Sequence, residues 1–84
     1  MNQTRINATR IQQWMVDYLA RELEVEPGVL DVDTTFIRLG VSSFTVISMT
    51  GVLEELLDKP LEERLAFEYP TIRKFSNYLA GLSK

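Results

Sequence analysis

The chain has 84 residues, of which 45% are hydrophobic and 25% are charged, and its formal net charge is -3. This length predicts one small domain over residues 1–84 with an ordered core over about 8–82, and the hydrophobic content is sufficient for a single core. No basic stripe is present, so we expect no nucleic-acid partner.

The sequence contains no cysteine and no histidine. Disulfides, thiolate catalysis, a Ser–His–Asp triad and metal sites built on thiolate or imidazole ligands are therefore excluded. We expect no catalytic residue, no metal and no enzyme activity of the chain's own. No signal-peptide pattern and no apolar run of membrane-spanning length is present, so the sequence predicts a cytoplasmic protein with no membrane partner.

The first predicted helix covers residues 8–23, where apolar residues recur at helical spacing. These apolar residues are Ile11, Trp14, Met15, Tyr18, Leu19 and Leu23. Two starts are open, one with Asn7 as the N-cap and one with Thr9 in a capping box. We expect Pro27 and Gly28 to end the helix.

A long connection follows over residues 26–40, and it places Val29, Leu30, Phe36 and Leu39 among polar turn residues. A free linker would not need isolated apolar residues at such positions. The pattern therefore predicts that the connection folds back across the core.

The second predicted helix runs from the N-cap Ser42 to about Leu57. Its apolar residues cover more than one helix face, and they are Val46, Ile47, Met49, Val52, Leu53 and Leu56. A glycine inside a helix costs roughly 1 kcal/mol relative to alanine, so we expect Gly51 to mark close packing against another helix.

The dipeptide Lys59-Pro60 interrupts this pattern, and a short helix is predicted within residues 61–67. Thr71 is the expected cap of a last helix that ends at about Leu82. The inward residues of this last helix are Ile72, Phe75, Tyr78 and Leu79. Together the elements predict an all-α fold, a small four-helix bundle with three longer helices, one short helix and a long loop between the first two.

Two adjacent serines, Ser42 and Ser43, stand at the start of the second predicted helix. In one interpretation Ser42 caps the helix and Ser43 faces the solvent. In a second, one serine is a nucleophile, which the absence of histidine and of a G-x-S-x-G elbow disfavours. In a third, one serine carries a covalently attached phosphate group, because the free N–H groups and the dipole at a helix N-terminus favour an anion there.

Three motifs follow one another along the chain: "DTTFIRLG" over residues 33–40, "VSSF" over 41–44 and "FEYPTI" over 67–72. Their order resembles the acyl carrier proteins, in particular the carrier domains of polyketide synthases. The usual pattern of these domains is D-x-x-F-x-x-L-G, then Gly-x-Asp-Ser-Leu at the start of a helix, and then F-E-Y-P-T-I. The resemblance extends from about residue 11 to residue 79.

The resemblance implies that Ser43 is the attachment point of a 4′-phosphopantetheine arm, which a separate phosphopantetheinyl transferase installs from coenzyme A. The thiol of that arm would carry an acyl group as a thioester, which accounts for a carrier without cysteine. The implied further partners are an acyltransferase, a ketosynthase or other enzymes of polyketide biosynthesis. We expect the protein itself to be a monomer.

The chain departs from the family pattern at three positions. Ser42 stands where relatives have aspartate, Phe44 where they have leucine, and Ser48 where many have glutamate. These changes leave the front of the second helix uncharged as far as Glu54. They indicate either drift on a tolerant surface or partners that dock by apolar and hydroxyl contacts in place of basic-to-acidic pairing.

The candidate recognition residues beside Ser43 are Ser42, Phe44, Val46, Ile47 and Met49. Some of them must belong to the core, and we expect this of Val46 and of either Ile47 or Met49.

Two alternative functions stay open. A peptidyl carrier of a nonribosomal peptide synthetase often has a second glycine in "LGGxS", and Val41 at that position favours the polyketide type. The second alternative is a docking module that has lost the modification, which the serine at position 42 suggests.

Overall fold

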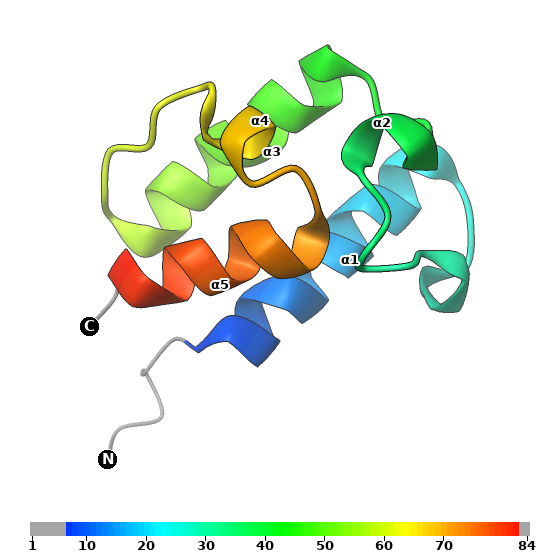
Figure 1. The fold of residues 1–84 in the computed structure, drawn as a ribbon, viewed down its shortest axis with the longest axis horizontal. Helices are drawn as coiled ribbons and strands as arrows, with labels where there is room; N and C mark the ends of the chain where they lie inside the picture. Colours follow the sequence, from blue (N-terminus) through cyan, green and yellow to red (C-terminus); the bar gives the residue numbers. More distant parts are fainter. Residues whose placement is uncertain (1–6, 83–84) are drawn as a thin grey trace.

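The computed structural model describes residues 7–82. Within them the chain forms an α-helical bundle with no strand, in which Thr35 and Thr71 make a single isolated antiparallel bridge (Figure 1). The elements are α1 (Ala8–Leu23), a 3-10 turn η1 (Pro27–Val29), α2 (Phe36–Leu39), α3 (Ser43–Leu57), α4 (Leu65–Glu68) and α5 (Ile72–Leu82). The predicted all-α bundle is confirmed, and η1 and α2 lie within the connection that was expected to be a loop.

The first helix has the predicted bounds, residues 8–23, and one of its two predicted starts is confirmed. The backbone N–H of Arg10 donates to Oδ1 of Asn7 at 2.9 Å, so Asn7 is the N-cap. Pro27 and Gly28 were expected to stop the helix, but α1 closes before them at Glu24, which adopts the left-handed conformation with φ 58°. Pro27 and Gly28 instead belong to the 3-10 turn, for which proline supplies a suitable fixed φ.

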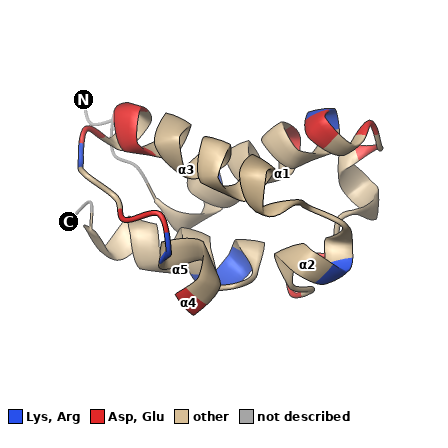
Figure 2. Ribbon diagram, turned by 90° about the horizontal axis from the view of Figure 1, so that it is seen from above, with Lys and Arg blue, Asp and Glu red and all other residues tan. Residues whose placement is uncertain are grey.

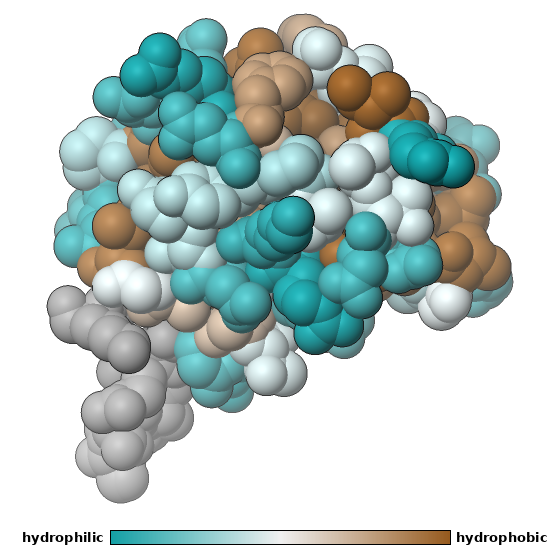
Figure 3. Space-filling model, viewed as in Figure 1, coloured by the Kyte–Doolittle hydropathy of each residue, from teal (hydrophilic) through white to brown (hydrophobic). Residues whose placement is uncertain are grey.

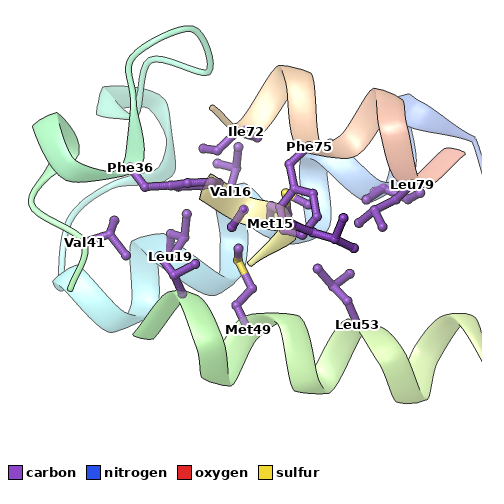
Figure 4. Close-up of a cluster of buried hydrophobic side chains, with 14 of the residues drawn as sticks. Met15, Val16, Leu19, Phe36, Val41, Met49, Leu53, Ile72, Phe75 and Leu79 are labelled. Atoms are coloured by element: carbon purple, nitrogen blue, oxygen red, sulfur yellow. The ribbon is translucent and has the colours of Figure 1, made fainter. Parts of the chain in front are cut away.

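The core lies between α1, α3 and α5, and α1 and α5 lie side by side (Figures 1 and 4). Its fully buried large side chains are Met15, Leu19, Met49, Leu53, Ile72, Phe75 and Leu79. Burial of each such side chain contributes about 1.5–3 kcal/mol. Trp14 stacks on Tyr18 with a centroid distance of 5.1 Å and packs against the edge of this core.

The connection between α1 and α3 folds back onto the core, as predicted. Phe36 is buried and meets Phe75 edge-to-face at a centroid distance of 6.3 Å. Leu30 and Leu39 are half-buried and pack against the same cluster. Val29 differs from the prediction, since it is exposed at the end of η1.

Later elements agree with the prediction in position but not in every detail. Ser42 caps α3, and Thr71 caps α5 by accepting from the N–H of Lys74 at 3.1 Å. The short helix α4 begins at Leu65, later in the predicted segment than expected. The expected packing role of Gly51 is wrong, because this residue is exposed and an added Cβ would meet no atom within 4 Å.

Gly51→Ala should therefore stabilise the protein. Alanine removes the backbone entropy cost of glycine and meets no obstacle, so the free energy of unfolding should rise by about 0.5–1 kcal/mol. Urea unfolding followed by circular dichroism measures this change.

Gly40→Ala is the opposite control. Gly40 has φ 91°, which alanine adopts only with strain, so this variant should lose about 1–2 kcal/mol. A Gly51→Ala variant that is less stable than the wild type would contradict the assignment of Gly51 to the solvent face.

Candidate functional site

The start of α3 uses one of its two serines as a cap. The backbone N–H of Thr45 donates to Oγ of Ser42 at 3.1 Å, and the Ser42 hydroxyl donates to Oγ1 of Thr45 at the same distance. The N–H of Val46 donates to the Ser42 carbonyl oxygen at 3.0 Å. These bonds satisfy groups that a helix N-terminus otherwise leaves unpaired, and they commit the Ser42 hydroxyl to a structural role.

Ser43 is the first residue of α3, and its side chain is exposed. Within residues 7–82 its hydroxyl forms no hydrogen bond. The positive end of the α3 dipole lies beside it, where a negatively charged group is stabilised. The two serines therefore differ in availability: Ser42 holds the helix start, and Ser43 presents a free hydroxyl at the same place.

A cavity of about 250 Å³ lies beside Ser43. Three helices form most of its wall, and they contribute Phe36 and Ile37 from α2, Ser43 and Val46 from α3, and Ala66 and Phe67 from α4. The wall is mostly apolar. A flexible chain attached to Ser43 would therefore have an apolar surface within reach.

The helix α2 has only four residues, and it is held in place by the start of α5. The N–H of Phe36 donates to the Pro70 carbonyl oxygen at 2.9 Å, and the N–H of Arg73 donates to the Val32 carbonyl oxygen at 3.0 Å. Arg73 also forms a two-pronged ion pair with Asp33, with Nε–Oδ1 at 2.6 Å and Nη2–Oδ2 at 3.2 Å. These contacts position the α2 wall of the cavity beside Ser43.

The five candidate recognition residues divide between surface and core. Ser42 is exposed, as are Phe44 at 79% and Ile47 at 38% of their maximal surface. Val46 and Met49 are 3% and 0% exposed, so they pack α3 onto the core and present no surface to a partner. The expectation that Val46 and either Ile47 or Met49 belong to the core is confirmed, and Met49 is the buried one of the two.

The sequence analysis missed two exposed residues beside Ser43, and it missed the ion pair that holds α2 in place. Ile37 on α2 and Phe67 on α4 are 78% and 52% exposed, and both line the cavity beside Ser43. Asp33 and Arg73 are 40 positions apart in the chain. Asp33 opens the first motif and Arg73 directly follows the last one, and this position beside motifs was the only indication of the pair in the sequence.

Within residues 7–82, no group of three or more acidic side chains is placed to hold a metal ion. No helix in that range combines the length and apolarity needed to cross a membrane.

The sequence of this chain is similar to a known protein family and to known proteins. The profile of a family described as "Phosphopantetheine attachment site" matches residues 13–79. One subunit of the phenolphthiocerol/phthiocerol polyketide synthase of Mycobacterium tuberculosis is 34% identical over 71 residues, which are 84% of this chain and 4% of that protein. The chain therefore corresponds to a small part of this relative's length.

Solved structures show the same fold in carriers of two types. A free-standing peptidyl carrier protein from Acinetobacter baumannii has a TM-score of 0.87 and 31% identity, covering 93% of this chain and 98% of that one. Asl1650 from Anabaena, an acyl carrier protein with a variant phosphopantetheinylation-site sequence, has a TM-score of 0.82 and 34% identity, covering 93% and 89% of the two chains.

The Asp33–Arg73 pair predicts a pH-dependent part of the stability. The hydrogen bond from Arg73, together with its charge, lowers the pKa of the Asp33 carboxyl below its usual value. A carboxylate with a lowered folded-state pKa contributes stability above its unfolded pKa of about 3.9 and loses it as pH falls through the lowered value. Asp33→Asn should therefore be less stable than the wild type at neutral pH, and this difference should shrink in acid.

Urea unfolding of both proteins at several pH values between neutral and strongly acidic measures this difference. Asp58→Asn is the control, because it removes a carboxylate that forms no ion pair within the described part of the chain. A difference between the wild type and Asp33→Asn that is independent of pH would contradict the role of the ion pair.

Proposed function

Since the chain belongs to the phosphopantetheine attachment-site family of carrier proteins, whose members carry a covalently attached 4′-phosphopantetheine, we propose that Ser43 is its attachment point. We propose further that the protein holds acyl intermediates of polyketide biosynthesis and presents them to partner enzymes. On this proposal the protein is the substrate of a phosphopantetheinyl transferase and catalyses no step itself.

The observation that carries the proposal is the difference between the two serines. The Ser42 hydroxyl is engaged with Thr45 in the cap of α3, whereas the Ser43 hydroxyl is exposed and makes no hydrogen bond within residues 7–82. A phosphate on Ser43 would lie at the positive end of α3, which favours its charge. The cavity beside Ser43 supplies an apolar wall, so the residues present fit the group.

The residues of this chain act by holding and positioning. The bound arm supplies a thiol that carries the acyl group as a thioester. Ser43 provides the covalent anchor, the cap at Ser42 keeps the first turn of α3 in place, and α2 forms a wall beside the anchor. A tethered group reaches a partner active site at a high effective concentration, so positioning by a carrier accelerates a reaction that the carrier does not catalyse.

The polyketide assignment is supported by the similarity to the mycobacterial polyketide synthase and by Val41 at the position of the second glycine of peptidyl carriers. A peptidyl carrier is the second candidate, because the Acinetobacter baumannii structure is described as one. The Anabaena acyl carrier protein is described as having a variant phosphopantetheinylation-site sequence, so a departure from the usual site pattern is compatible with this fold.

Incubation with coenzyme A and a broad-specificity phosphopantetheinyl transferase tests the proposal. The intact mass of the protein should rise by one phosphopantetheine group. Ser43→Ala should abolish the gain, because it removes the attachment oxygen. Ser42→Ala should keep the gain but should lower the free energy of unfolding by about 1 kcal/mol, because it removes the cap.

The contrary results are equally distinct. If the wild type gains no mass while a control carrier does, the chain is a docking module and the proposal fails. If Ser42→Ala abolishes the gain and Ser43→Ala does not, the attachment serine is the other one.

The modified protein then separates the two carrier types. It is incubated with an acyl-coenzyme A and a polyketide acyltransferase, and separately with an amino acid, ATP and a peptide-synthetase adenylation enzyme. The proposal expects loading in the first mixture, measured by intact mass. Loading in the second mixture alone would favour the peptidyl carrier.

A further inference from the structure

The segment that surrounds Ser43 carries almost no charge, although the protein as a whole is acidic. The twenty residues 34–53 include all of α2 and most of α3, and their one charged residue is Arg38. Figure 2 shows α3 without charge over most of its length and with acidic residues at its C-terminal end. This segment around Ser43 therefore carries a single positive charge in a protein whose net charge is -3.

Large apolar side chains from three helices are exposed near Ser43. Ile37 on α2, Phe44 on α3 and Phe67 on α4 are 78%, 79% and 52% exposed. Ile37 and Phe67 line the cavity together with Ser43, and Phe44 is its neighbour in the chain. Figure 3 shows apolar surface where the three helices approach one another. Large exposed apolar residues gathered near one site are typical of an interaction surface.

The charges at the border of this face are not equivalent. On the α4 side, the Nε of Arg64 lies 3.3 Å from Glu62 and 3.8 Å from Glu68, which partly offsets the acidic charge there. On the α2 side, the exposed guanidinium of Arg38 forms no ion pair within residues 7–82. A partner that covers this side gains from a carboxylate opposite Arg38 and is disfavoured by a cation there.

We propose that the phosphopantetheinyl transferase docks on this face through an apolar surface that contacts Ile37, Phe44 and Phe67, with a carboxylate at its rim that pairs with Arg38. The inference rests on the proposed function, because an enzyme that modifies Ser43 must cover the residues around that hydroxyl. The apolar contacts supply most of the affinity, and the Arg38 contact sets orientation and association rate.

Reversing the charge of Arg38 shows whether the transferase presents a negative or a positive charge opposite this residue. The probe is the transferase that modifies the wild type, and the readout is kcat and KM for the unmodified protein at low and high salt. Arg38→Glu should raise KM roughly tenfold with little change in kcat, and the effect should weaken at high salt, because a rim charge pair is screened. Lys59→Glu makes the same charge change beyond the far end of α3 and should leave KM within about twofold of the wild type.

Truncation of the apolar side chains gives the second readout. Phe44→Ala should raise KM by roughly tenfold, as expected for an aromatic residue at an interface. Leu56→Ala is the matched control, because Leu56 is also exposed on α3 but near its C-terminal end. Circular dichroism confirms that each variant is folded.

The outcomes distinguish this inference from the proposed function. If the wild type is not modified at all, both fail. If the wild type is modified but Arg38→Glu lowers KM, the transferase is basic at that point and the inference alone is overturned. The same holds if Arg38→Glu and Phe44→Ala behave like their controls.

Discussion

The attachment of residues 32–36 to the start of α5 is the constraint on which the surface beside Ser43 depends. Two backbone hydrogen bonds, the Asp33–Arg73 ion pair and the edge-to-face contact of Phe36 with Phe75 join these distant segments. A helix as short as α2 does not persist without such support, because one turn does not repay the cost of nucleation. The cavity wall beside Ser43 therefore depends on a contact made far away in the chain.

At the start of α3, two neighbouring hydroxyl groups have different environments. Capping requires a side-chain oxygen at the residue before the helix, and Ser42 meets this requirement through Thr45. The next residue has helical backbone geometry, and the Ser43 side chain is exposed. A chain with neither histidine nor cysteine thus presents an exposed hydroxyl at a helix N-terminus, and we propose this hydroxyl as the attachment point of the group that its carrier family bears.

Prediction from the sequence worked where a pattern has one structural solution. The apolar spacing of α1 and the cap at Ser42 defined their helices correctly, because both depend on residues three or four positions apart. It failed for Gly51, whose helix has apolar residues on more than one face, so that the pattern did not show which face is buried. The sequence also left open whether Ile47 or Met49 is the buried residue, for the same reason.

The sequence by itself determined the three longer helices, the caps at Ser42 and Thr71 and the position of the candidate serine, since these features depend on local spacing and on short motifs. Only the tertiary structure decided that the connection contains α2 and that Asp33 meets Arg73. It also decided that Ile37 and Phe67 stand exposed beside Ser43. The physical reason is that these features depend on which helix faces pack together, and residues tens of positions apart meet only when the core has formed.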